Sequence, residues 1–409
     1  MDKRIVITGI GVISPIGIGK EAFWEGLKDG RSGIKPITIF NPSFYKCKMA
    51  GEISDFSAEQ FLGAKGLLNL DRATKLVCSA AELALKDSKL EITDENSEDI
   101  GVVTGTTLSF WSIAEMTREI VEDGPQFTSA GFFAGTTFNS ASSQISIRYH
   151  IKGFNTTIST GYTASMDALK YAVNFIKLNR AKAILVAGVE GLTFASFTGF
   201  YKIGFLAGIN GEEICCPFDK RRNGIILGEA AAVLIIEDEE HARARNAKIY
   251  AELAGVENSF YAFRATKYDP QARGIKKTMR KALQNAQMHE EDIDYISAAA
   301  NSVGQQDRLE TMAIKEVFNI YASKIPVSAI KSMVGESVSA GGVLQIAAAI
   351  GSIHQSFIPP TINYKEKDPL CDLDYVVNQS REMDIENILI NNFGPGGNNA
   401  TAIIKQYTE

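Results

Sequence analysis

Residues 156–166 of the chain read Thr156-Thr157-Ile158-Ser159-Thr160-Gly161-Tyr162-Thr163-Ala164-Ser165-Met166. This stretch predicts a strand, a tight turn that contains glycine, and the start of a helix. A turn of this kind places its apical side chain in the open, beside unpaired backbone amides and the positive end of the helix dipole. Because this geometry presents a catalytic nucleophile, the stretch predicts an α/β fold with a site at the turn.

The residue at the apex of this turn is Tyr162. A thiol in the same position would be acidified and reactive. A phenol has a pKa of about 10, so it stays protonated near neutral pH and is a poor nucleophile without a strong base beside it. The apex is therefore filled by a bulky group rather than a reactive one. The alternative is an ordinary strand-to-helix turn with an aromatic ring packed over it.

The composition is that of a globular protein with two domains or a duplicated unit. The chain has 409 residues, 45% of them hydrophobic, and a net charge of -6, and this length exceeds one ordinary core. No nucleic-acid partner is expected, because an acidic chain lacks the concentrated basic face that neutralises phosphates. The run Lys220-Arg221-Arg222 is interpreted as a solvated or salt-bridged loop. The apolar stretch at 341–353 is too short to span a bilayer, so we expect a core helix there and no membrane contact.

Neither a metal nor another cofactor is expected. The five cysteines are scattered, without a CxxC pair or metal-ligand spacing, which favours a reducing cytoplasm as the location. The four histidines also lack metal-ligand spacing. The run Gly9-Ile10-Gly11-Val12-Ile13-Ser14 has Ser14 where a dinucleotide-binding fingerprint has its third glycine.

Runs rich in Val and Ile alternate with helical stretches, which predicts an α/β protein with buried sheets. Strands are expected at 5–7, 100–103, 183–187, 231–236, 250–256, 388–391 and 400–404. Helices are expected at 20–27, 70–89, 164–178, 274–286, 307–317 and 341–355. The regular pattern breaks near residue 250, so we predict two halves of similar βα design, residues 1–250 and 251–409, that share one core.

Three further segments are candidates to line a cavity. Residues 297–307 and 331–337 each follow a strand and lead into a helix, so they are expected to aim side chains toward one site. The loop Asn391-Asn392-Phe393-Gly394-Pro395-Gly396-Gly397-Asn398-Asn399 is rich in glycine. A glycine loop alone is weak evidence, because backbone tightness explains it equally well.

Taken together, these segments resemble the β-ketoacyl synthases, the condensing enzymes of fatty acid and polyketide synthesis. The resemblance covers essentially the whole chain, and the order and spacing of its motifs carry it. They are the opening Arg4-Ile5-Val6-Ile7-Thr8-Gly9-Ile10-Gly11, the stretch Pro217-Phe218-Asp219-Lys220-Arg221-Arg222-Asn223-Gly224, then Leu227-Gly228-Glu229, and Asn392-Phe393-Gly394. The resemblance implies a thiolase-like fold, in which two similar βα halves form a layered αβαβα core.

The three reactive positions of that family differ in this chain. Tyr162 stands where the family has its cysteine nucleophile, and Ala299 and Glu336 stand where it has two histidines. Ala299 has no group that could exchange a proton, and an ionised Glu336 would place negative charge where an enolate oxygen must be stabilised. The resemblance therefore implies that the chain has no catalytic residues. It also implies that the ring of Tyr162 fills the site and that Glu336 forms an ion pair with Lys331.

Other parts of the family's site are retained. The family's supporting charged residues are matched by Lys331, Asp307 and Glu310. The resemblance implies that the glycine loop is a gate of the pocket. In this loop the chain keeps Phe393 of the family's motif, but Pro395 stands where the family usually has an aromatic residue.

An inactive member of this family is similar to the chain length factor of type II polyketide synthases. The resemblance implies an active ketosynthase subunit as partner in a heterodimer, an acyl carrier protein reached through that complex, and a growing polyketide or acyl chain in a shared tunnel. Chain length factors commonly carry glutamine at the elbow, where this chain has Tyr162. By position, large side chains expected to shape the tunnel or the interface are Leu108, Phe110, Trp111, Phe132, Phe133 and Phe138. Ordinary core or dimer packing is the alternative for these aromatic residues.

Two other functions stay open. Tyr162 and Glu336 could serve an altered acyl transfer or hydrolysis, which would require an activating base near the phenol. The chain could also be a homodimeric acyl-binding protein that has no ketosynthase partner.

Overall fold

A computed structural model of the protein describes residues 3–108 and 111–408, except for the side chain of Phe132. Within these residues an 11-stranded mixed sheet runs in the order β11-β10-β14-β15-β9-β1-β8-β7-β5-β6, with the short β2 beside β1. Its strands are β1 (Ile5–Ser14), β2 (Gly17–Ile18), β5 (Ile100–Gly105), β6 (Asn155–Ile158), β7 (Ala183–Glu190), β8 (Ala230–Asp238), β9 (Ala251–Phe260), β10 (Tyr295–Ser297), β11 (Val327–Ser328), β14 (Asn387–Phe393) and β15 (Asn398–Lys405). Two small ribbons pair β3 (Lys35–Pro36) with β4 (Met49–Ala50) and β12 (Phe357–Ile358) with β13 (Arg381–Glu382).

The sheet consists of two sets of strands with the same order. From the middle outward, one set runs β1-β8-β7-β5-β6 and the other runs β9-β15-β14-β10-β11. If the five strands of each set are numbered by their order along the chain, both sets have the spatial order 1-5-4-2-3 from the middle of the sheet outward. The sets meet where β1 pairs with β9 through Val6 and Ile7. Two halves of similar βα design are thus present, as the sequence predicts.

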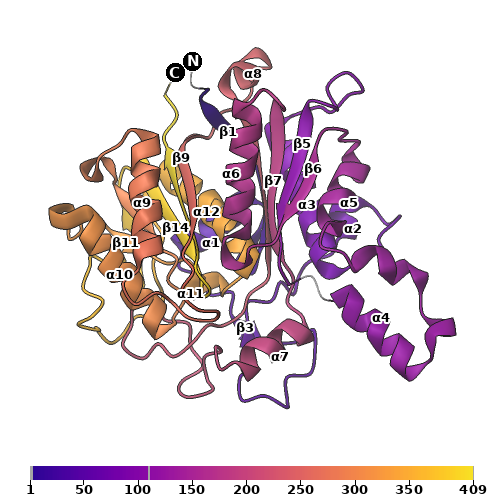
Figure 1. Cartoon of the computed structure of the whole chain (residues 1–409), viewed down its shortest axis with the longest axis horizontal. Helices are drawn as coiled ribbons and strands as arrows, with labels where there is room; N and C mark the ends of the chain where they lie inside the picture. Colours follow the sequence, from indigo (N-terminus) through magenta and orange to yellow (C-terminus); the bar gives the residue numbers. More distant parts are fainter. Residues whose placement is uncertain (1–2, 109–110, 409) are drawn as a thin grey trace.

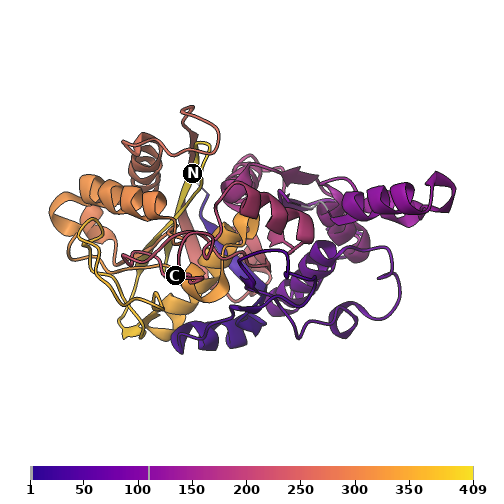
Figure 2. The ribbon, with the colours of Figure 1, turned by 90° about the horizontal axis from the view of Figure 1, so that it is seen from below.

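The helices form three layers around these strands (Figures 1 and 2). The middle layer consists of α6 (Ala164–Lys177) and α12 (Gly341–Gln355), which contact strands of both halves. One outer layer holds α3 (Arg72–Ser88) against β1 and β8, and the other holds α9 (Arg273–Ala286) against β9 and β15, with α10 (Gly304–Phe318) packed on α9. The layered αβαβα core is therefore confirmed.

The middle helix α12 explains the most apolar stretch of the chain. Its residues 341–353 are all buried, as is typical of a helix that is apolar on every face. No helix in the described part of the chain is long and apolar enough to cross a membrane. The predicted core helix is confirmed.

The glycines of the first strand are required for close packing. A Cβ added at Gly11 would lie 1.9 Å from the carbonyl oxygen of Ala80 in α3, and one at Gly9 would lie 2.6 Å from that of Ala84. These glycines let α3 lie directly on β1, and no phosphate-binding role is needed to explain them.

The remaining helices are shorter or lie outside these layers. They are α1 (Lys20–Lys28), α2 (Glu59–Leu62), α4 (Trp111–Glu122), α5 (Ser140–Tyr149), α7 (Phe194–Lys202), α8 (Glu239–Ala244) and α11 (Lys331–Val334). One of them, α11, is completely buried. Figures 1 and 2 show α4 and the segment that follows it extending away from the body. We call residues 111–138 the arm; it includes the short 3-10 helices Pro125–Phe127 and Ala130–Gly135, on which α4 packs.

Candidate functional site

The elbow has the predicted geometry. β6 ends at Ile158, a 3-10 turn covers Gly161–Thr163, and α6 begins at Ala164. Gly161 has a φ of 74°, a conformation that suits glycine. The side chain at the apex is not in the open, however, because Tyr162 is only 8% exposed. It belongs to a hydrophobic cluster with Leu108, Phe197 and Leu206.

The ring of Tyr162 lies against the glycine loop between β14 and β15. A Cβ added at Gly394 would lie 2.4 Å from Cδ2 of Tyr162. Asn398 Nδ2 donates a hydrogen bond of 2.8 Å to the carbonyl oxygen of Thr160, so the loop is hydrogen-bonded to the elbow as well as packed on the ring. Phe393 is buried and Pro395 is half-buried. The cavity that Gly394 lines together with Tyr261 has a volume of about 20 Å³, which is too small for an acyl group.

The hydroxyl of Tyr162 has no hydrogen-bond partner among the described residues. Burial, and then the nearby charge of Glu336, raise the pKa of Tyr162 well above its usual value. The phenol is therefore neutral near pH 7, and no base is hydrogen-bonded to it. An activated phenolate is not available in this arrangement.

Ala299 and Glu336 face the same region. Ala299 follows β10 and is fully buried. Its amide donates to Glu310 Oε1 at 2.9 Å, and its carbonyl accepts from Lys331 Nζ at 3.1 Å. The backbone at this position is thus held in place, but the methyl side chain offers no proton donor or acceptor.

Glu336 and Lys331 form the expected pair. Lys331 Nζ lies 2.9 Å from Glu336 Oε2, and both side chains are almost completely buried. The same oxygen accepts from Asn301 Nδ2 at 2.8 Å, and Glu336 Oε1 accepts from the amide of Val338 at 2.9 Å. The carboxylate is therefore fully committed to protein donors, which offset the cost of burying its charge.

Asp307 and Glu310 lie one turn apart on α10 and hold backbone rather than face a cavity. Asp307 accepts from the amides of Phe218 at 2.9 Å and Asn301 at 3.1 Å, with Arg222 Nε at 3.6 Å. Burial raises the pKa of Asp307 to about 6 and that of Glu310 to about 7. These residues support the turn that carries Ala299. Arg221 and Arg222 are paired with Asp219 and Asp368, as expected of a salt-bridged loop.

Two groups near the site were not singled out from the sequence. Glu190, at the end of β7, accepts hydrogen bonds from Thr106 Oγ1 at 3.0 Å, the amide of Leu108 at 2.9 Å and Ser339 Oγ at 3.1 Å. Burial raises its pKa to about 7. In the sequence, the signal that could have identified Glu190 is a single acidic residue at the end of a buried strand. Tyr268 is also buried and donates to Gln306, but nothing in its local sequence marks it.

The cysteines do not provide a substitute nucleophile. Cys215 donates its thiol to the carbonyl of Lys331 at 3.3 Å, and burial raises its pKa well above the usual value. Burial also raises the pKa of Cys216 to about 11. All five thiols are free and buried, so none is poised as a thiolate.

The histidines lie away from the elbow. His241 is bonded to Glu237 and His354 stacks near Trp24, while His150 and His289 are exposed. Among the described residues no group of His, Cys, Asp and Glu could hold a metal ion.

The predicted tunnel residues divide into two sets. Leu108 packs against the hydrophobic cluster that contains Tyr162. Trp111, Phe133 and Phe138 are 38%, 68% and 42% exposed, so they are not core residues of this chain. Phe110 and the side chain of Phe132 lie outside the described residues.

Comparison with known proteins agrees with this fold along its whole length. The model of the β-ketoacyl synthase N-terminal domain matches residues 2–242, and that of the C-terminal domain matches residues 250–365. The chain is 37% identical over 408 residues to the 3-oxoacyl-[acyl-carrier-protein] synthase 2 of Coxiella burnetii, covering 99% of each protein.

Two solved structures are similar over their full length. The ishigamide ketosynthase/chain length factor superposes with a TM-score of 0.93 at 33% identity, with 100% of both chains covered. The AntDE:AntF complex, a type II polyketide synthase acyl-carrier protein with its ketosynthase bound to the hexaketide, gives a TM-score of 0.91 at 29% identity, again with 100% of both chains covered.

Proposed function

This chain belongs to the β-ketoacyl synthase family, and we propose that within it the chain is a chain length factor, the non-catalytic partner of an intact ketosynthase. In this role it pairs with a subunit that carries the elbow cysteine and helps set the length of the polyketide made there. The likeness to the ishigamide ketosynthase/chain length factor supports this choice.

The observation that carries the proposal is the closed elbow. Tyr162 is a buried, neutral phenol in the place of a nucleophile, and its ring fills the space beside Gly394. Ala299 cannot exchange a proton, and Glu336 is committed to Lys331 and Asn301. Condensation needs a nucleophile, and decarboxylation of malonate needs stabilisation of a developing negative charge. These residues supply neither, which supports a role without catalysis of its own.

The exposed arm supports a protein partner. β6 lies at the end of the sheet, and among the described residues no strand pairs with its outer side. Large apolar side chains are exposed on the adjacent arm: Trp111, Ile113, Ile120, Val121, Phe127, Phe133 and Phe138. A free sheet edge beside exposed apolar side chains is typical of a surface that another chain covers. An intact ketosynthase is the partner that the family membership favours.

The same surface provides the route by which the chain would influence product length. Leu108 packs against the cluster that contains Tyr162, and Trp111 begins the arm that would meet the partner. A large ring at the end of the partner's acyl tunnel would stop a growing chain, and a smaller side chain would lengthen the cavity. Replacing Trp111 by Ala in the assembled complex is therefore expected to shift products to longer chains. The substrate in this proposal is a polyketide delivered on an acyl carrier protein, as in the AntDE:AntF complex.

The first experiment is co-expression with the nearest ketosynthase that has cysteine at its elbow, followed by native mass spectrometry. A one-to-one heterodimer is expected. The variant Phe127→Ser/Phe133→Ser on the arm should weaken the heterodimer at least tenfold. Phe44→Ser, which changes an even more exposed phenylalanine away from the arm, is the control and should leave assembly intact.

Two outcomes would reject the proposal. A homodimer that ignores the ketosynthase would favour an independent acyl-binding protein. Transfer of a radiolabelled acyl group to the isolated chain, lost in Tyr162→Phe, would favour an enzyme with altered chemistry.

A further inference from the structure

Glu190, the last residue of β7, lies between the elbow and the start of the arm. It is 3% exposed. Its carboxylate accepts hydrogen bonds from one short segment: from Thr106 Oγ1 at 3.0 Å, from the amide of Thr107 at 3.2 Å and from the amide of Leu108 at 2.9 Å. Two residues separate Leu108 from Trp111, where the arm begins. We call residues 106–108 the arm base, and Glu190 holds it in position.

Two hydroxyl groups join the arm base to the elbow. Ser339 Oγ lies 3.1 Å from Glu190 Oε2, 2.7 Å from Thr107 Oγ1 and 3.2 Å from the carbonyl oxygen of Gly161. The amide of Gly161 in turn donates to Thr107 Oγ1 at 3.2 Å. The elbow and the arm base therefore belong to one hydrogen-bond network, in which Glu190 is an acceptor. A change in one member of such a network affects the others.

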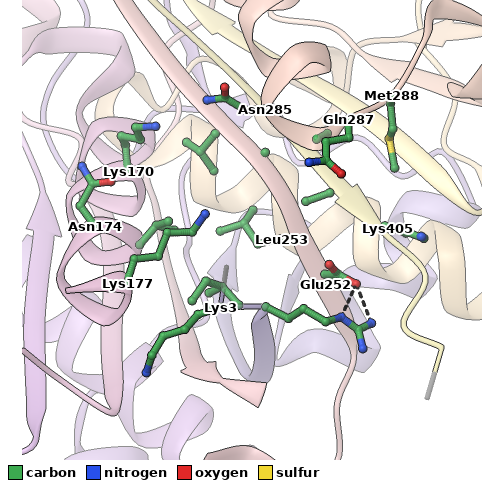
Figure 3. Close-up of a pocket in the computed structure, with 17 residues that line it drawn as sticks. Lys3, Lys170, Asn174, Lys177, Glu252, Leu253, Asn285, Gln287, Met288 and Lys405 are labelled. Atoms are coloured by element: carbon green, nitrogen blue, oxygen red, sulfur yellow. Dashed lines mark hydrogen bonds and ion pairs between the residues drawn. The ribbon is translucent and has the colours of Figure 1, made fainter. Parts of the chain in front are cut away.

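The donors to Glu190 are neutral groups, whereas several other carboxylates of this chain are ion-paired. Glu252, which lines the pocket drawn in Figure 3, is held by Arg4 Nη2 at 2.7 Å, and Glu257 is held by Lys170 Nζ at 2.7 Å. Within the described residues no ion pair includes Glu190. A buried carboxyl group without a cation needs hydrogen-bond donors to offset the loss of water. The donors of the arm base meet this need.

The arm depends on its ends for its position. Within α4, all of which the structure describes, only Ser112 is buried, so the helix has little packing on the body of the chain. Leu108, by contrast, packs against the cluster that contains Tyr162. The arm base is thus held by apolar contact as well as by its hydrogen bonds to Glu190. A shift at the arm base would be passed on to Trp111.

We propose that Glu190 is a positioning residue, which fixes the direction in which the arm leaves the elbow and thereby the depth at which Trp111 closes the partner's acyl tunnel. This role rests on the proposed function, in which the arm meets the ketosynthase. Glu190 itself is buried and does not contact the growing chain. Without its acceptor oxygens the arm base is less restrained, and a less restrained arm lets the chain extend further before it stops.

Fluorine NMR of the full chain labelled with 5-fluorotryptophan tests the positioning without a partner. The chain has two tryptophans, Trp111 on the arm and Trp24 buried in the body, so Trp24 is an internal reference. In Glu190→Ala the Trp111 resonance is expected to shift by more than its linewidth, while the Trp24 resonance stays. Glu190→Gln should restore the original spectrum, because its amide oxygen still accepts from Leu108.

A second variant and a control complete this experiment. Thr107→Val removes the acceptor of the Gly161 amide and should also shift the Trp111 resonance, which provides the test if Glu190→Ala does not fold. The control is Asp294→Ala, at the other end of the sheet. Asp294 likewise accepts from two successive amides, those of Glu386 and Asn387, both at 2.9 Å. Its replacement should leave both resonances in place.

The same variants are then compared in the heterodimer by mass spectrometry of the released products. Glu190→Ala should raise the share of products longer than the main one about fivefold, as for the loss of one hydrogen bond, and Glu190→Gln should not. An unshifted Trp111 resonance in both Glu190→Ala and Thr107→Val would overturn the inference. So would an unchanged product length in a complex where Trp111→Ala lengthens the products. If Trp111→Ala is also without effect, the chain-length function itself is rejected, and the role of Glu190 with it.

Discussion

Tyr162 and Glu336 close the site by different physical means. The tyrosine does so by volume, since its ring fills the space against Gly394. The glutamate does so by charge, since its carboxylate forms a buried pair with Lys331 at 2.9 Å. Removing one member of such a pair leaves an uncompensated buried charge, which costs about 3–5 kcal/mol. At the scale of single residues, substitution of either Glu336 or Lys331 alone is therefore expected to destabilise the fold.

Substitutions at Tyr162 separate the contribution of the ring from that of the hydroxyl. Because the hydroxyl is buried without a partner, Tyr162→Phe is expected to leave the free energy of unfolding unchanged or higher, within about 1 kcal/mol. Tyr162→Ala is expected to cost about 3–5 kcal/mol through the cavity that it creates. Urea unfolding measures both. A large loss in Tyr162→Phe would mean that the hydroxyl is hydrogen-bonded in the folded chain.

Buried carboxyl groups make stability depend on pH. Burial raises the pKa of Glu190 and Glu310 from 4.5 to about 7 and that of Asp307 from 3.8 to about 6. The folded chain keeps these protons where the unfolded chain has released them, so the free energy of unfolding falls as pH rises from about 4 to about 7. Above about pH 7 these carboxyl groups are ionised in the folded chain as well, so they no longer make the free energy of unfolding depend on pH.

The variant Glu190→Gln tests this pH dependence, because the amide keeps an acceptor oxygen but cannot ionise. Calorimetric Tm values at pH 5 and pH 7.5 should differ less in Glu190→Gln than in the unmodified chain. The exposed Glu382→Gln is the control and should retain the full difference. An unchanged difference in Glu190→Gln would show that this carboxyl does not contribute.

At the scale of elements, the glycine loop and the elbow are one packing unit. The close approach of Gly394 to the Tyr162 ring leaves no room for a methyl group, so Gly394→Ala is expected to cost about 1–3 kcal/mol. In a Tyr162→Ala background the same change should cost less, because the two ring carbons at 2.4 Å are absent and only the Cβ of residue 162, at 2.9 Å, is still in the way. A double-mutant cycle by urea unfolding measures this coupling. Additive effects would mean that the loop and the ring are independent.

At the scale of the whole molecule, the two halves share their middle layer. The helix α12 comes from the second half of the chain but packs on β7 and β8 of the first, and α6 of the first half contacts β9 of the second. We propose residue 250 as the boundary between halves that cannot fold separately. The full chain is expected to unfold in one calorimetric transition, and residues 1–250 alone should lack fixed tertiary structure by near-ultraviolet circular dichroism. A folded fragment would contradict this.

The sequence predicted those elements whose pattern is local. The runs of Val and Ile became strands, and the apolar stretch at 341–353 became the buried helix α12. The exposed arm was not predicted as a helix, because its apolar side chains have no core of this chain to face. The motif order located Tyr162, Ala299 and Glu336, whereas Glu190 and Tyr268 join the site through residues distant in sequence. Contacts between residues that are distant in sequence leave no periodic hydrophobic pattern by which they could be predicted.

The closed elbow also bears on the evolutionary history open to this chain. A lineage that acquired a cysteine at residue 162 would first lose the packing of the ring against Gly394. One that acquired a histidine at residue 336 would first leave Lys331 without its carboxylate. Each step reduces stability before the complete set of reactive groups exists, and selection removes variants that fall below the stability needed to fold. For a chain with the proposed non-catalytic role, a path to a condensing enzyme is therefore obstructed by folding, independently of any selection on activity.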